Sequence, residues 1–168
     1  ANMLQNILFL DIETVPQYAS YEDLPDIWKE LWARKAEVLI RNKEEQTVES
    51  IYNRASIYAE FGKVVCISSG VINGSGSSKQ LLIKSFAGDD EKSILSSFCD
   101  MLSKWSAESQ KFLCAHNGKE FDYPYLCRRM VVNDVCIPSV LSISGKKPWE
   151  VNHLDTMELW KFGDYKSY

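Results

Sequence analysis

The sequence predicts an α/β fold in which a mixed sheet of antiparallel and parallel strands is flanked by helices. Short apolar runs bounded by turn residues alternate with longer amphipathic segments, which is typical of strands alternating with helices. Their order is strand, helical segment, antiparallel hairpin, helix, strand, helix, and this order favours a mixed sheet. With 168 residues, 45% of them hydrophobic, the chain can bury a real core, and we expect one domain over 3–168.

The first predicted strand is the apolar run 7–10, which continues into Asp11 and Glu13 and is stopped by Pro16. A run this short and this apolar indicates a central strand buried on both faces. Because side chains alternate along a strand, Asp11 and Glu13 point to the same side, about 7 Å apart. Two acids at the end of a buried strand lose solvation energy, and a divalent metal ion is their usual partner. The alternative is a strand that ends in solvated acids.

A helical insertion is predicted after this strand, over about 21–60. It contains two apolar stripes at helical spacing: Ile27, Trp28, Leu31, Trp32, Ala36 and Leu39 in the first, and Val48, Ile51, Tyr52 and Ala55 in the second. We expect the two tryptophans to pack in a core rather than to stack on nucleic-acid bases.

The remaining elements follow from turn and capping signals. Segments 63–73 and 80–86 are rich in strand-forming residues and are separated by a Gly/Ser turn, which predicts an antiparallel hairpin. Segment 88–90 caps an amphipathic helix that extends to Trp105. A short buried strand is predicted over 111–115 and a further helix over about 123–133, with Asp122 near its N-cap.

Composition excludes several classes of protein. The five cysteines form no C-x-x-C pair and fall in apolar contexts, so we expect buried free thiols rather than disulfides or zinc ligands. A net charge of −4 argues against a generally basic nucleic-acid binder, although it is compatible with a nuclease whose acids hold metal ions. No apolar stretch is long enough to span a membrane, and a cytoplasmic location without membrane partners is the expectation.

A second acidic element lies at 115–122. It leaves the predicted strand 111–115, turns at Asn117-Gly118 and places Asp122 at the start of a helix. Ligand sites of such sheets lie at the carboxyl ends of parallel strands. If the two strands are neighbours, Asp122 faces Asp11 and Glu13, and three converging carboxylates repel one another unless cations are bound.

These residues resemble motifs of a known family. Residues 10–14, Leu-Asp-Ile-Glu-Thr, resemble the first motif of the DEDD 3′–5′ exonucleases, and residues 116–122 resemble the second, Asn-x-x-x-Phe-Asp. Residues 154–156, Leu-Asp-Thr, are similar to a segment that often follows. Nearly the whole chain resembles the predicted exonucleases related to the proofreading domain of family-B DNA polymerases. The resemblance implies a ribonuclease H-like fold and two-metal hydrolysis of phosphodiester bonds at the 3′ end of single-stranded nucleic acid, with DNA favoured over RNA.

The resemblance also implies a set of site residues. Two ions, Mg²⁺ or Mn²⁺, would be held by Asp11, Glu13 and Asp122, which are also the catalytic residues, with Asp11 bridging the ions. Substrate contacts are expected from Thr14, Asn117 and Phe121. Supporting positions behind the ligands are expected for His116 and Asp155.

One expected motif is missing from residues 1–168. The family has a third motif, Tyr or His followed four residues later by Asp, and no such pair fits here. We therefore expect an exonuclease domain truncated at its C-terminus, with impaired activity in this chain. Two alternatives stay open: a catalytically silent module of the same fold that binds nucleic acid or another partner, and a different ribonuclease H-like metal enzyme such as an endonuclease. The oligomeric state is left open.

Overall fold

The computed structural model describes residues 3–41 and 45–164. These residues form five strands and four α-helices, joined by short 3₁₀ turns. The strands are β1 (Ile7–Pro16), β2 (Gly62–Asn73), β3 (Gln80–Ala87), β4 (Phe112–Ala115) and β5 (Leu154–Asp155). The helices are α1 (Asp26–Leu39), α2 (Glu91–Trp105), α3 (Asp122–Val132) and α4 (Thr156–Lys161).

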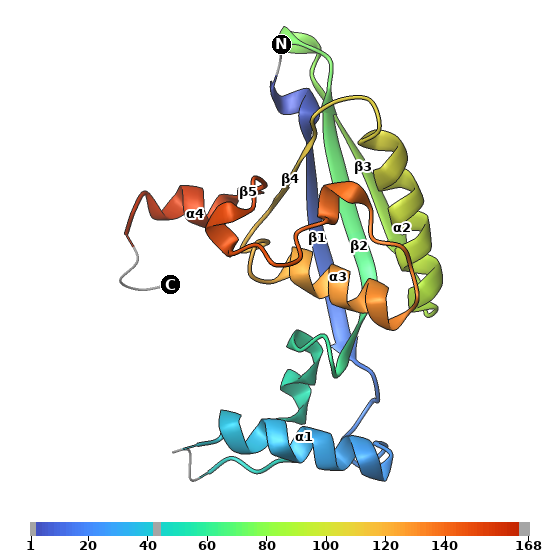
Figure 1. The fold of residues 1–168 in the computed structure, drawn as a ribbon, viewed down its shortest axis with the longest axis vertical. Helices are drawn as coiled ribbons and strands as arrows, with labels where there is room; N and C mark the ends of the chain where they lie inside the picture. Colours follow the sequence, from blue (N-terminus) through green and yellow to red (C-terminus); the bar gives the residue numbers. More distant parts are fainter. Residues whose placement is uncertain (1–2, 42–44, 165–168) are drawn as a thin grey trace. The chain divides into compact units, whose positions relative to one another are not determined.

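The five strands make one sheet in the order β3-β2-β1-β4-β5, with β1 in the middle (Figure 1). Strands β2 and β3 pair antiparallel, whereas β4 pairs parallel with both β1 and β5. The prediction of an α/β fold with a mixed sheet and flanking helices is therefore confirmed. The register of the parallel pair β1/β4 places the carboxyl end of β4 beside the middle of β1, just before Asp11.

The chain divides into two compact units, residues 1–13 with 64–168, and residues 14–63. The second unit has a core of its own around Trp32, whose ring packs edge-on against Tyr52 and Phe61. The Trp32 indole N–H donates to the Val48 carbonyl at 2.9 Å, so its one polar atom is satisfied. Trp32 is thus a core residue, as predicted, and it is not available for stacking on bases.

The predicted apolar stripe of α1 is wrong at two positions. Ile27 and Leu31 are 59% and 41% exposed, while Trp32 and Ala36 are buried. Residues four apart share one side of a helix, and α1 buries only the side that carries Trp32 and Ala36. The second stripe also differs from the expected α-helix, because residues 52–57 form a 3₁₀ segment.

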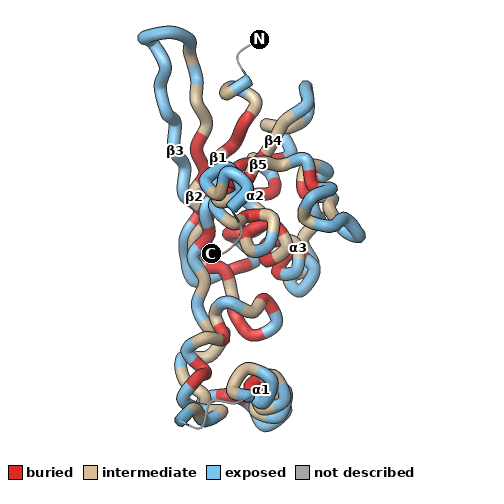
Figure 2. Tube along the Cα trace, turned by 90° about the vertical axis from the view of Figure 1, so that its left-hand side faces the viewer, coloured by how far each residue is buried: buried red, intermediate tan, exposed pale blue. Residues whose placement is uncertain are grey.

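In the first unit, α2 packs against β3 and α3. The Asp90 side chain caps α2 by accepting from the Ser93 N–H, and the predicted apolar face is buried at Ile94, Leu95, Phe98 and Leu102. Figure 2 shows the buried residues concentrated on the strands and on the helices that cover them, whereas β3 is exposed along almost its whole length.

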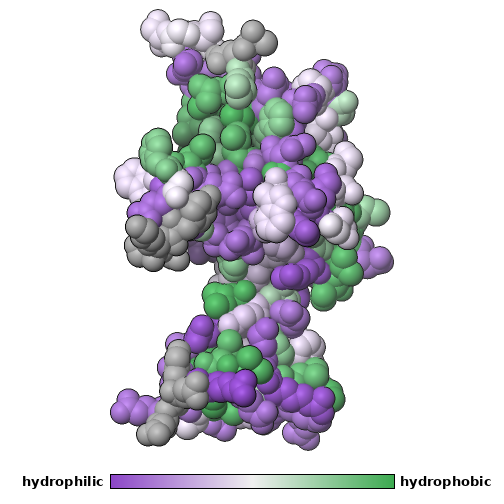
Figure 3. Space-filling view, turned by 60° about the vertical axis from the view of Figure 1, so that its left-hand side comes forward, coloured by the Kyte–Doolittle hydropathy of each residue, from purple (hydrophilic) through white to green (hydrophobic). Residues whose placement is uncertain are grey.

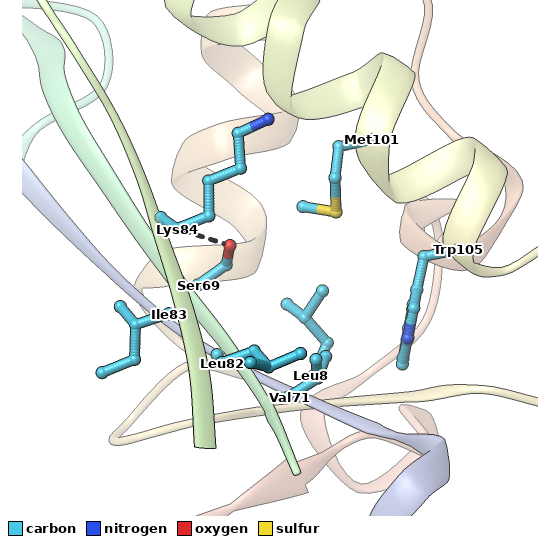
Figure 4. A pocket seen from close by; sticks show the side chains of 9 residues that line it. Leu8, Ser69, Val71, Leu82, Ile83, Lys84, Met101 and Trp105 are labelled. Carbon is cyan, nitrogen blue, oxygen red and sulfur yellow. Dashed lines mark hydrogen bonds between the residues drawn. The ribbon is translucent and has the colours of Figure 1, made fainter. Parts of the chain in front are cut away.

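Two hollows lie in this unit. The first, about 150 Å³, is apolar and lies between Leu8 and Val71 of the sheet, Leu82 of β3, and Met101 and Trp105 of α2 (Figure 4). The second lies beside the start of α2, along residues 85–90. Neither is lined by an acid of the two motif segments. Among the described residues, no helix combines the length and the apolar character that a membrane span requires.

Candidate active site

Asp11 and Glu13 lie inside β1 rather than at its end, because the strand continues to Pro16. Leu8, Leu10 and Ile12 are buried, while Asp11 and Glu13 are exposed. The expected burial on both faces therefore holds only for the first part of the strand. From residue 10 onward one face is buried and the other carries both acids, as the twofold alternation of a strand requires.

A tight turn connects β4 to α3. Asn117 has a left-handed backbone (φ 58°), and its carbonyl accepts the Phe121 N–H at 2.9 Å. The Gly118 carbonyl accepts the Tyr123 N–H at 2.9 Å, so the turn is bonded directly to the first residues of the helix. Asp122 is the first residue of α3, close to the predicted position, although the N-cap residue is Phe121 and no side chain caps this helix.

Asp122 is the most unusual carboxyl group of the site. It is 2% exposed, and its Oδ1 is buried without a hydrogen-bond partner. Burial, and then the nearby Asp11 carboxylate, raise its pKa to about 6 against the opposing effect of backbone N–H groups that include Ile12. Asp11 and Asp122, far apart in the sequence, thus share one electrostatic environment, and one oxygen of Asp122 has no hydrogen-bond partner.

The carboxylates of Asp11 and Asp122 are chemically suited to bind a hard divalent cation. Carboxylate oxygens are the ligands that Mg²⁺ and Mn²⁺ prefer, and an unpartnered buried carboxylate oxygen gains most from a cation. Within residues 3–41 and 45–164, however, no three or more His, Cys, Asp or Glu side chains are grouped so that they could hold a metal ion. Glu13 therefore does not complete a three-ligand group with Asp11 and Asp122.

Asp155 lies next to this pair but is fully engaged elsewhere. It is 3% exposed, and its carboxylate accepts from the backbone N–H groups of Asn117 (2.9 Å), Lys119 (3.2 Å) and Met157 (2.9 Å). It thereby holds the turn before α3 and caps α4 at the same time. Three donors leave it poorly suited to bind a metal ion.

The other predicted site residues are placed as follows. His116 Nδ1 lies 3.0 Å from the Thr156 hydroxyl, and the Phe121 ring contacts the ring of Tyr125. Asn117 Oδ1 is a second buried oxygen without a hydrogen-bond partner. Thr14 follows Glu13 on β1 but belongs to the second compact unit. Their roles toward a substrate stay predictions.

The sequence Arg128-Arg129 favours a solvated helix face, with a phosphate contact as the alternative; Arg128 is exposed, as a solvated face requires, but Arg129 is not. Arg129 is buried and donates from Nε and Nη2 to the two carboxylate oxygens of Glu91 at 2.8 and 2.7 Å. Asn133, the C-cap residue of α3, donates to the same carboxylate. The Arg-x-x-x-Asn spacing of residues 129 and 133 was the only sign in the sequence that Arg129 and Asn133 share a partner, and this sign is weak.

No protein-family model and no curated protein matches the chain. Among solved structures, the family B DNA polymerase from the hyperthermophilic archaeon Pyrobaculum calidifontis matches with a TM-score of 0.44 and 15% identity. The match covers 92% of this chain but only 16% of the polymerase.

Proposed function

We propose that this chain is a metal-dependent 3′–5′ exonuclease domain that acts on single-stranded nucleic acid, with DNA preferred over RNA. The observation that carries the proposal is that the Asp11 carboxylate acts on the buried Asp122, whose Oδ1 has no hydrogen-bond partner. Both acids lie in the two segments that resemble the exonuclease motifs. A buried carboxylate oxygen normally has a hydrogen-bond donor or a cation beside it, so a buried oxygen with neither indicates a ligand position.

In this proposal Asp11, Glu13 and Asp122 hold Mg²⁺ or Mn²⁺. Two such ions would supply an activated water and stabilise the charge that develops on the phosphate and on the leaving 3′-oxygen. Asp11 is exposed on β1 and is therefore placed to serve a ligand from the solvent side, whereas Asp122 approaches from the buried side. Glu13 would complete the set by a side-chain rotation, because exposed glutamates lose little on changing rotamer.

Three residues are proposed to contact the strand. Asn117 Oδ1 is a buried acceptor without a donor, and a sugar hydroxyl could supply one. Phe121 offers an aromatic ring for a terminal base, supported by the Tyr125 ring at 5.3 Å. Thr14 is proposed as a third contact from β1.

The test is hydrolysis of 5′-labelled single-stranded DNA, and of RNA of the same sequence, with Mg²⁺ or Mn²⁺ and the chain in excess. Because residues 1–168 lack the third motif, we expect slow cleavage that is detectable with the chain in excess: a ladder that shortens from the 3′ end and is lost in Asp11→Asn and in Asp122→Asn. Asp90→Asn is the matched control, because it removes a carboxylate that only caps α2. No shortening with either metal, or shortening that survives Asp11→Asn, would contradict the proposal. An oligonucleotide blocked at its 3′ end separates exonuclease from endonuclease cleavage.

A catalytically silent binding module is the second candidate, and one observation favours it. Large apolar side chains are exposed on the edge strand β3, where Ile83 is 68% exposed, and in the last described residues, where Phe162 is 93% exposed. Figure 3 shows hydrophobic residues gathered on one face of the first unit, beside a hydrophilic band. Exposed apolar groups of this kind are typical of surfaces that bind partners. Retention of the DNA without cleavage, unchanged in Asp11→Asn, would favour this candidate.

A further inference from the structure

The segment 154–158 makes contact with the turn before α3 at several points. The Asp155 carboxylate accepts from the backbone of Asn117 and Lys119, as described above. The Thr156 hydroxyl lies 3.0 Å from His116, and Glu158 forms an ion pair with Lys119 at 2.8 Å. One residue further into α3, the buried Tyr123 hydroxyl donates to the Leu154 carbonyl at 2.9 Å.

These contacts have one consequence for Asp122. The turn that they hold is bonded to the start of α3 through the Asn117 and Gly118 carbonyls, so its position sets where the helix begins. Asp122 is the first residue of that helix. Asp155 is thus connected to Asp122 through its hydrogen bonds to the backbone of the turn, and its carboxylate also helps to raise the pKa of Asp122.

We propose that Asp155 is a positioning residue, which holds Asp122 in place for a divalent cation by fixing the 117–119 turn. The inference rests on the proposed function, since it assigns Asp122 as a ligand. Supporting residues of this kind commonly change metal affinity by about 10–100-fold when they are replaced. Asp155 itself does not bind the ion, because its oxygens already accept three N–H groups.

The experiment measures the Mn²⁺ dissociation constant of the whole chain by titration, with free Mn²⁺ followed by electron paramagnetic resonance. Hydrogen exchange of the Asn117 and Lys119 amides is measured in the same samples. In Asp155→Asn we expect an increase of about tenfold or more in the dissociation constant, together with faster exchange of these two amides. Asp90→Asn is the matched control, since Asp90 also caps a helix but does not touch the turn. It should leave both readouts unchanged.

A purely structural role predicts a different pattern. If Asp155 only stabilises the fold, Asp155→Asn should have a lower melting temperature, but the folded variant should bind Mn²⁺ as tightly as the parent. That result would overturn the inference. Failure of the parent chain to bind Mn²⁺ would instead count against the proposed function.

A milder variant covers the case in which Asp155→Asn does not fold. The double substitution Thr156→Val and Glu158→Gln removes the His116 contact and the Lys119 ion pair but keeps the Asp155 carboxylate. We expect Mn²⁺ binding to weaken by about two- to fivefold, less than for the loss of the charged hydrogen bonds. A folded double variant in which the Asn117 and Lys119 amides exchange faster, but which binds Mn²⁺ as tightly as the parent, would overturn the inference, because the position of the turn would then not affect binding.

Discussion

Glu91 on α2 and Arg129 on α3 form a two-pronged ion pair that is almost completely buried. The same Glu91 carboxylate accepts the Val64 N–H of β2 at 2.8 Å and the Asn133 amide at 2.9 Å. One carboxylate therefore joins a strand and two helices of the first unit. The pair stands at the opposite end of the Arg129 helix from Asp122, so it fixes α3 where the Asp155 contacts do not reach.

Replacing Glu91 should destabilise the fold strongly. Glu91→Gln leaves a buried guanidinium without its counter-charge, and removal of one partner of a buried pair costs about 3–5 kcal/mol. Urea unfolding of the parent and the variant measures this difference. Glu158→Gln is the control, because its pair with Lys119 is partly exposed and we expect a loss below about 1 kcal/mol. Equal losses in the two variants would contradict the role given to the buried pair.

The Glu91 carboxyl should also contribute to acid sensitivity. Burial raises its pKa, but the hydrogen bonds from Arg129, Val64 and Asn133 outweigh burial and hold the pKa below its ordinary value of 4.5. Its stabilisation is therefore complete above about pH 4.5 and is lost as the pH falls through the lower pKa of the folded protein. The acid limb of unfolding should become shallower in Glu91→Gln.

The Asp122 carboxyl should change the stability of the fold with pH in the direction opposite to Glu91. Its pKa is raised from 3.8 to about 6, so the folded protein retains this proton over a range in which the unfolded chain has lost it. Without metal, stability should fall as the pH rises from about 4 to 6, by up to about 3 kcal/mol, and then stay level. Asp122→Asn should remove this fall and be more stable than the parent at pH 7. Mn²⁺ should raise the melting temperature of the parent but not of Asp122→Asn. A difference in stability between the parent and Asp122→Asn that stays constant from pH 4 to 6 would count against this environment.

His153 is expected to be neutral with its proton on Nε2. Its Nδ1 accepts the Leu113 N–H at 3.2 Å, and its Nε2 lies 2.7 Å from the Val140 carbonyl, which can only accept. Burial, helped by Lys146 and Lys119, lowers its pKa below 6.5. The stability due to neutral His153 is thus complete above about pH 6.5 and is lost as the pH falls through the folded pKa. Nitrogen-15 NMR of the ring identifies the tautomer, and a protonated Nδ1 at pH 7.5 would refute the assignment.

The elements that could be predicted from the sequence are those in which apolar residues recur at a regular spacing. Helix α2 and the β2/β3 hairpin follow from spacing and turn residues, because many side chains of each element report the same geometry. Strand β5 has only two residues, Leu154 and Asp155, and too few side chains to show any period. The link between Asp11 and Asp122 depends on β1 and β4 being parallel neighbours, which is a long-range pairing that no local pattern encodes. Arg129 was misjudged because burial of an arginine depends on a partner in another element.

Gly118 should be intolerant of a side chain, and this tests whether the turn sets metal affinity. A Cβ added there would lie 2.5 Å from the Ala115 Cβ and 3.0 Å from Tyr123 Cζ, so Gly118→Ala must displace the turn or the start of α3. We expect a loss of about 1–3 kcal/mol in urea unfolding and weaker Mn²⁺ binding.

Gly76→Ala is the matched control: Gly76 also resists a side chain, because its φ is +56°, but it lies in the β2–β3 loop with open space around it. It should lose stability and keep its Mn²⁺ affinity. Ala115→Gly combined with Gly118→Ala removes the shortest clash, and it should therefore recover part of both the stability and the Mn²⁺ affinity. If the single and double variants bind Mn²⁺ equally well, the geometry of this turn does not control the position of Asp122.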